Sequence, residues 1–337
     1  MPMRYLIPAF VIAAAALGAG AAYGQLVLPS GSQGSVSLAR IDEIVVYHKQ
    51  WEELIVRATI AEPVDMPTIE RLAFVVPVPG IPDLAELQSS DVFTELKAFE
   101  QRHPDGADKV PEIAGDYVLS TVAREQGKPI CETLNRWLEL NGLNTIEESK
   151  LKWYDENGWS FVVQRISRTS HHGAGALKPV RISFEESYVT FPLKHAVQDQ
   201  PVSATLFLIT KDNLDTSLLE DYGFTLRLGA DVPNRVNFKS LPQSVETMVT
   251  KFGNHRGVFK ELRRGHVYLY SALADFTPGD ASRQQWEADV QIAGPRMSVA
   301  GLTQNALAIA AAVLTIVLMS LPKKKPANDR NTAKTPD

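Results

Sequence analysis

The strongest chemical candidates in the chain are two adjacent histidines, His171 and His172. They lie in the segment SRTSHHGAGALKP (167–179), whose glycines and serine are typical of an exposed loop. A metal site needs imidazoles that converge from separated positions, whereas adjacent side chains in an extended loop point apart. We therefore interpret the pair as solvated, and keep a metal or proton-transfer role as the weaker alternative.

Two short acidic stretches offer carboxylates that can act as general acid and base, namely Asp155 with Glu156 and Glu185 with Glu186. Neighbours on a strand face opposite sides, so Glu185 and Glu186 are poor partners, and we interpret all four as solvated. The sequence contains no Gly-x-Ser-x-Gly, His-Glu-x-x-His, Cys-x-x-Cys or phosphate-loop motif. We expect no catalytic residues, no metal site and no cofactor.

Three further features are interpreted as structural. The single cysteine, Cys131, lies on a predicted helix and is expected to be a buried, inert thiol, with a reactive or intermolecular thiol as the alternative. A group of aromatic residues is expected to pack helices onto a sheet, with a glycan-stacking platform as the alternative: Trp137, Trp153, Tyr154, Trp159 and Phe161. The segment KELRRGH (260–266) is a small basic patch, expected to be a solvated turn.

Both ends of the chain carry apolar segments. Residues 1–24 combine Arg4, an apolar stretch and the small-residue sequence Ala22-Tyr23-Gly24, which is the pattern of a signal peptide. An uncleaved anchor is the alternative. Residues 302–321 are uncharged and long enough for one membrane-spanning helix, because about 20 residues at 1.5 Å each cross a bilayer core of about 30 Å.

The charges predict the orientation of the chain. Lys323, Lys324 and Lys325 follow the apolar stretch directly and act as a stop signal, which places the tail (322–337) in the cytoplasm. The tail carries five basic and two acidic residues, Arg4 adds one positive charge, and the whole chain has a net charge of −5, so the body carries about −9. Such an acidic body makes nucleic acid an improbable partner.

The body predicts an α+β fold with a mainly antiparallel sheet. Residues 25–40 are expected to be a flexible lead-in, and 44–47 with 54–60 form a strand pair. Helices are expected in SSDVFTELKAFEQRH (89–103), KPICETLNRWLELNGL (128–143) and NTIEESKLKWYDENGW (144–159), the last with a capping box of Thr145 and Glu148. Strands are expected at 115–123, 159–167, 180–194 and 202–210, with weaker strands beyond. Because strands surround a helical cluster without regular alternation, a doubly wound fold is disfavoured.

The segment FVVPVPGIP (74–82) starts as a strand and then contains three prolines. Proline cannot donate a hydrogen bond to a sheet ladder, so we expect the strand to leave the sheet at Pro77 and continue as extended chain. An exposed proline-rich ligand is the alternative.

Several segments together resemble a known family. They are FVVPVPGIPDL with FTELKAF, GDYVLSTVA, LNRWLELNGL, YDENGWSFVVQRI, and LKPVRISFEESYVTFPLKH leading to ATLFLIT. This series, over about residues 41–210, resembles the secreted bacterial family known as domain of unknown function 2330. The resemblance implies an exported, often membrane-tethered protein and implies no activity. Typical members carry cysteines just after the signal peptide, and this chain has none there.

These observations lead to one functional hypothesis and one competitor. The first is a single-pass protein of the bacterial cytoplasmic membrane, with a family-like domain at 41–215 and a β-rich continuation at 216–296 on the extracytoplasmic side. It would act as a non-catalytic binding or assembly module that contacts the lipid bilayer and an envelope protein or glycan. The competitor is a tethered envelope hydrolase that uses His171 or His172 with a carboxylate.

Overall fold

The computed structural model describes a defined part of the chain: residues 26–27, 36–61, 71–101, 110–125, 127–167, 174–187, 189–191, 201–214, 217–221, 223–228, 235–250, 256–276 and 290–292. The chain divides into two compact units, 1–294 and 295–337, and every described residue belongs to the first. The predicted signal peptide, the apolar stretch at 302–321, the tail and both His171 and His172 lie outside the described residues. None of the described helices is both long enough and apolar enough to cross a bilayer.

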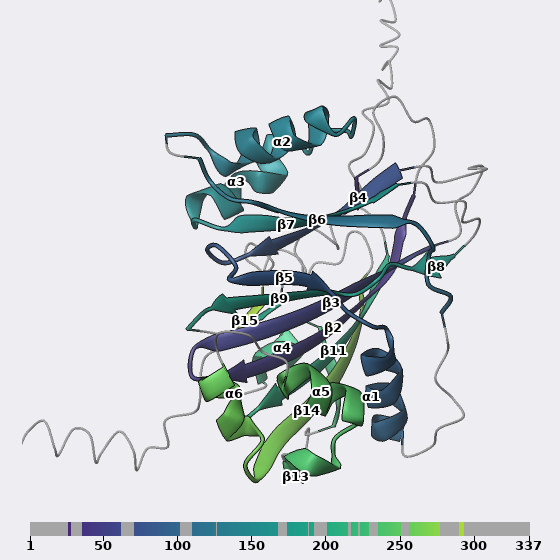
Figure 1. The fold of residues 1–337 in the computed structure, drawn as a ribbon, viewed down its shortest axis with the longest axis vertical. Helices are drawn as coiled ribbons and strands as arrows, with labels where there is room; N and C mark the ends of the chain where they lie inside the picture. The colour runs from purple at the N-terminus through teal and green to yellow at the C-terminus, as the bar shows by residue number, and fades with distance from the viewer. Residues whose placement is uncertain are drawn as a thin grey trace, which may run out of the picture. The chain divides into compact units, whose positions relative to one another are not determined.

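The larger sheet has nine strands: β2 (Leu38–His48), β3 (Trp51–Ile60), β5 (Leu84–Leu87), β8 (Gly175–Ala176), β9 (Val180–Glu185), β11 (Val202–Thr210), β12 (Thr225–Leu228), β13 (Arg235–Asn237) and β14 (His266–Phe276). Its main order is β12-β14-β11-β2-β3-β9-β5, with β13 beside β14 and β8 beside β3 (Figure 1). Strands β11 and β2 run parallel, and the other pairs run antiparallel. The predicted mixture of helices and mainly antiparallel sheet is therefore confirmed.

The smaller sheet has four antiparallel strands in the order β1 (Leu26–Val27), β4 (Arg71–Val78), β7 (Ser160–Ser167) and β6 (Asp116–Val122). A separate pair joins β10 (Val189–Phe191) to β15 (Val290–Ile292). Residues 25–40, expected as a flexible lead-in, thus include β1 and the start of β2. Apolar Leu26 and Val27 of β1 pair with Phe74 and Ala73 of β4.

The alternation of side chains along the strands sorts the apolar residues into three layers. One face of each sheet contributes to a shared core, which contains Val45 and Val56 from the larger sheet and Phe74 and Val162 from the smaller one. The opposite face of each sheet also carries buried apolar residues, which helices cover. The fold therefore stacks helices, the larger sheet, the smaller sheet and more helices.

The expected helical cluster is divided between these two outer faces, as Figure 1 shows. The helices α1 (Asp91–Gln101), α5 (Gln243–Thr250) and α6 (Arg256–Leu262), with the 3-10 turn η2 (Phe238–Ser240), pack on the larger sheet. The helices α2 (Ile130–Leu140) and α3 (Glu148–Glu156) pack on the smaller sheet, and α4 (Ser217–Asp221) lies near β12. The apolar face of α1 consists of Val92, Phe93 and Leu96, which are buried against this sheet, and Phe99, which packs beside them.

The proline-containing strand differs from its prediction. β4 does not leave the sheet at Pro77, because Pro77 pairs with Phe161 and Val78 with Ser160 of β7. The other neighbour of β4, β1, reaches only Phe74 and Ala73. Among the described strands, β4 is thus paired on one side only at Pro77. A proline is tolerated there because no second neighbouring strand requires a backbone N–H donor at this position.

Two local predictions also need correction. The capping box of Thr145 and Glu148 does not form, since α3 begins at Glu148, its N-cap is Glu147, and no side chain caps it. The expected loop at 167–179 includes β8, whose Gly175 and Ala176 are buried and pair with Ile60 and Thr59. Ala176 contacts two separate segments, because it pairs with Thr59 of β3 and its amide donates to the carbonyl of Pro111 at 2.8 Å.

The turn between β2 and β3 has two residues, Lys49 and Gln50, with φ of 52° and 64°. A tight hairpin favours positive φ at both positions, although Asn and Gly adopt it more readily than Lys and Gln. Tertiary contacts hold the turn: the Glu186 amide donates to the Gln50 carbonyl at 2.8 Å, and Lys49 Nζ donates to Glu261 at 2.8 Å.

Candidate functional site

The most concentrated chemistry among the described residues is a charged cluster on the helix-covered face of the larger sheet. Asp42 of β2 accepts from Arg57 Nη2 of β3 at 2.6 Å and from Lys97 Nζ of α1 at 2.8 Å. Arg40 Nε lies 3.3 Å from the same carboxylate. The Arg57 guanidinium also lies over the ring of Phe93, 4.5 Å from its centroid. One buried carboxylate therefore contacts three cationic side chains.

Electrostatics keep Asp42 ionised. Burial alone raises the pKa of the Asp42 carboxyl, but the charges of Lys97, Arg57 and Arg40 outweigh that effect, and the resulting pKa is lower than usual. Lys97 is affected in the other direction, since burial lowers its pKa despite the attraction of Asp42. A carboxylate held in this way links β2, β3 and α1.

A second charged group lies on the same face, nearer the β5 end of the sheet. Arg181 of β9 is fully buried, and its Nε donates to Glu53 of β3 at 3.0 Å while its Nη1 donates to Glu86 of β5 at 2.6 Å. Glu53 is buried, whereas 42% of the Glu86 side chain is exposed. Burial raises the pKa of Glu53 to about 7 against the opposing charge of Arg181. The group links three neighbouring strands.

Two more buried titratable groups lie near the β2–β3 turn. His48 Nε2 is 3.3 Å from Glu261 Oε2 of α6, and burial lowers the pKa of His48. Glu52 points into the shared core, where its Oε2 accepts the Thr190 amide at 2.9 Å. Burial raises the pKa of Glu52 well above its ordinary value. The two groups lie on opposite faces of the sheet, so they do not form one constellation.

The chemical capacity of these groups is limited by how they are paired. No three His, Cys, Asp or Glu residues among the described ones could hold a metal ion together. Asp42 is bonded to Arg57 and Lys97, and Arg181 is bonded to Glu53 and Glu86. Charged groups bonded to one another inside the fold are typical of structural ion pairs. The sequence carries a signal for these groups, because charged residues interrupt the apolar strands RIDEIVVYH and WEELIVRATI.

The carboxylates proposed from the sequence are placed apart. Asp155, at the end of α3, accepts the Ile130 amide at the start of α2 at 2.7 Å and pairs with Arg124 at 2.8 Å. Glu156 is exposed. Glu185 is exposed on β9, and Glu186 follows the strand and accepts from the Ser187 amide at 2.6 Å. The structure thus gives Asp155 a capping role, and the two histidines lie outside the described residues.

The role of Asp155 can be tested against its neighbour. We expect Asp155→Ala to lower the free energy of unfolding by about 1–2 kcal/mol, because the first amide of α2 loses its acceptor. Glu156→Ala should cost only a few tenths of a kcal/mol, since its pair with Lys152 is exposed. Urea titration followed by tryptophan fluorescence measures both, and equal losses would contradict the capping role.

The remaining sequence candidates are structural. Cys131 is half-buried beside the core under α2 and α3, and burial raises the pKa of its thiol, which disfavours the reactive thiolate. The aromatic group packs helices onto the smaller sheet as predicted, with Tyr154 at the centre of edge-to-face contacts with Trp153, Trp159 and Phe161.

The basic patch at 260–266 forms the end of α6 and the turn before β14. Its charged side chains are exposed, and two of them have partners: Arg263 lies 3.5 Å from Glu246, and Glu261 contacts Lys49. The carbonyl of Arg264 also accepts from Lys211 Nζ at 2.7 Å. The patch is therefore an exposed turn whose contacts are made within the chain, in agreement with the predicted solvated turn.

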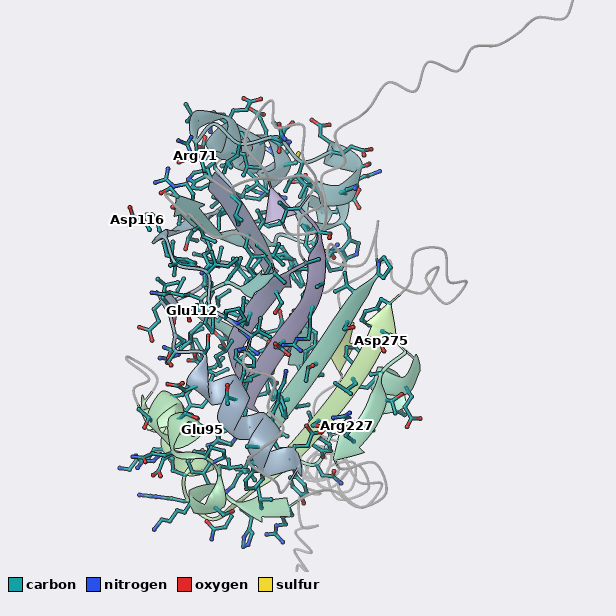
Figure 2. The ribbon with its side chains drawn as sticks, turned by 90° about the vertical axis from the view of Figure 1, so that its right-hand side faces the viewer. Arg71, Glu95, Glu112, Asp116, Arg227 and Asp275 are labelled. Carbon is teal, nitrogen blue, oxygen red and sulfur yellow. The ribbon has the colours of Figure 1, made fainter. Side chains whose placement is uncertain are left out.

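The outer strand β6 of the smaller sheet is a candidate interaction surface. It pairs with β7 along its whole length, from Asp116 opposite Ser167 to Val122 opposite Phe161, and no described strand pairs with its other side. Asp116, Val118 and Thr121 are exposed, and only Val122 is buried. Asp116 projects from the periphery in Figure 2. We call the side of residues 116–122 that faces away from β7 the β6 edge.

Fold and side chains define a mixed α/β domain with mainly antiparallel sheets and internally paired charges. The sequence model of a family described as "Uncharacterized protein conserved in bacteria (DUF2330)" matches residues 122–223. That range contains α2, α3, β7, β9 and β11, so the resemblance inferred from the sequence is confirmed there. The proline-containing segment at 74–82 lies outside the match.

Other comparisons add little. No curated protein matches the chain. The crystal structure of baculovirus P35 is similar over 78% of this chain and 98% of that chain, at 9% identity and a TM-score of 0.39. The caspase-8/P35 complex is similar over 76% of this chain and 96% of that chain, at 8% identity and a TM-score of 0.36. Legionella pneumophila aminopeptidase A in complex with aspartic acid is similar over 74% of this chain and 22% of that chain, at 10% identity and a TM-score of 0.21. These TM-scores are below 0.5 and support no conclusion about this chain.

Proposed function

We propose that this chain is a non-catalytic binding or assembly module of the bacterial cell envelope, anchored in the cytoplasmic membrane by residues 302–321. Its body would lie on the extracytoplasmic side and the lysine-rich tail in the cytoplasm. The observation that carries the binding role is the β6 edge, which offers backbone donors and acceptors along seven residues. An extended segment of a partner can add to such an edge as a further strand.

The internal pairing of the charged groups supports the same proposal. A catalytic carboxylate needs access to substrate, whereas Asp42 and Glu53 are buried and each is bonded to an arginine. These pairs also link β2, β3, β5 and β9 of the larger sheet and α1 to one another.

The binding role is tested by crosslinking the tagged full-length chain in its native envelope. Wild type should yield an adduct that disappears in V118K/S120K, because lysines along an edge oppose strand addition. The control H171A/H172A should retain the adduct, since the histidines belong to the competing hydrolase hypothesis. An adduct that is indifferent to the lysines, or that requires the histidines, would contradict the proposal.

The anchoring is tested separately by adding protease to intact spheroplasts. We expect the body to be digested and an epitope on the tail to be protected, because the bilayer shields only the cytoplasmic side. Immunoblotting against tags at both positions reads the result. A protected body with a digested tail would show the opposite orientation.

A further inference from the structure

We propose that the β6 edge pairs with the β6 edge of a second copy of this chain, antiparallel and with Leu119 at the two-fold axis. The inference rests on the proposed binding function and names the partner of that surface. It joins two four-stranded sheets into one continuous antiparallel sheet, in which β6 becomes a central strand in both copies.

The β6 edge is the outer strand best suited to pairing. Proteins protect sheet edges with short strands, bulges, prolines or lysines. Among the described outer strands, β1 has two residues, β5 has four, and β12 has four with a shift of register opposite β14. β6 has seven residues (DYVLSTV), keeps an unbroken register with β7, and contains no proline, glycine or lysine.

The exposure of β6 indicates a surface that lacks a cover. Val118 is 43% exposed, and it is one of three large apolar side chains that are exposed among the described residues. Tyr117 and Leu119 face the shared core but are only half-buried. Strand β5 of the larger sheet comes close to β6 without pairing with it. A neighbouring strand would bury Val118 and complete the cover of Tyr117 and Leu119.

A second copy fits this edge because the strand is complementary to itself. A two-fold pairing that uses all seven residues places Val118 opposite Ser120 of the second copy, Tyr117 opposite Thr121, and Asp116 opposite Val122. The one ionised side chain therefore faces no like charge, and an aromatic residue faces a β-branched one, which is a favourable pair across strands. Two seven-residue strands bury little area compared with a stable soluble dimer, so attachment of both copies to one membrane would assist the pairing.

The predicted register can be tested by charge pairs. In V118K/S120K, lysines of the two copies would face each other twice, whereas in V118E/S120K a glutamate would face a lysine twice. We expect the association constant of the dimer to be about tenfold lower than that of wild type for V118K/S120K and to be unchanged for V118E/S120K. Stepwise photobleaching of a fluorescent tag on the full-length chain in membrane vesicles counts the copies. Thermal unfolding checks that both variants are folded, and V118E/S120E replaces V118K/S120K if the latter is not.

Each outcome decides the matter. Two bleaching steps for wild type and V118E/S120K, with one step for V118K/S120K, support the pairing. One step for wild type overturns it, as do two steps for both variants or one step for both folded variants. If an edge-dependent adduct forms in the envelope while wild type bleaches in one step, the binding function stands and the partner is a different molecule.

Discussion

Replacing Asp42 with alanine is expected to lower the free energy of unfolding by about 3–5 kcal/mol. The substitution removes the one carboxylate that Arg57, Lys97 and Arg40 share. Only 5% of the Arg57 side chain is exposed, so its charge cannot recover hydration by turning outward. An unpaired charge in such a place costs several kcal/mol, far more than the net stabilisation that the ion pair itself supplies.

Two controls separate this effect from a general loss of charge. Glu139→Ala removes an exposed carboxylate on α2 and should change stability by less than about 0.5 kcal/mol. Asp42→Ala combined with Arg57→Met removes both members of the Asp42–Arg57 pair. It should lower the free energy of unfolding by less than the sum of the two single substitutions. Urea titration of the full-length chain measures all of them. A cost below about 1 kcal/mol for Asp42→Ala would show that the cluster is hydrated.

The same group predicts a response to acid. The pKa of Asp42 is lowered in the folded chain, so its stabilisation is complete above the ordinary range of an aspartate and is lost as the pH falls through the lowered value. Asp42→Ala should therefore differ most from wild type near neutral pH, and the difference should shrink in strong acid. A constant difference would contradict the assignment.

Much of the architecture could be predicted because it follows from local patterns. Alternating apolar residues in EIVVYHK and ELIVRATI place one set of side chains in the shared core and the other under the helices, and both strands were expected. The apolar face of α1 was readable in the same way. Gly142 and Gly158, which follow α2 and α3, adopt φ of 68° and 74°, the left-handed conformation in which a glycine commonly ends a helix.

The candidate sites could not be predicted, because they depend on strand register. Glu53 and Arg181 are 128 residues apart and His48 and Glu261 are 213 apart, and each pair meets only through pairing or packing of separated elements. Pro77 was misjudged for the same reason: whether a proline fits a strand depends on whether a second neighbour is present. The β6 edge likewise becomes visible only once the order of strands is known.

The second large effect concerns Glu53 and the stability of the chain between pH 4.5 and 7. Burial raises the pKa of Glu53 to about 7, whereas the unfolded chain retains the ordinary value of 4.5. The folded state therefore holds a proton over this range that the unfolded state has released. Stability is complete below the unfolded value and falls as the pH rises through the folded value, by about 3 kcal/mol in total.

The variant Glu53→Gln fixes the group in a neutral form and should remove this loss. Glutamine keeps the size of the side chain and an oxygen that can accept from Arg181 Nε. We expect it to match wild type near pH 4 and to gain about 3 kcal/mol relative to wild type by pH 8. Glu52 and His48 also titrate in the fold, so the measured quantity is the difference between variant and wild type at each pH.

Glu185→Gln is the matched control, since Glu185 lies on the same strand as Arg181 but is exposed. Solvent screens an exposed carboxylate, so this variant should follow the pH dependence of wild type closely. Urea titrations at intervals from pH 4 to 8 give both curves. If Glu53→Gln runs parallel to wild type, or loses stability toward pH 8, then Glu53 is ionised in the folded chain and its attraction to Arg181 exceeds the cost of burial.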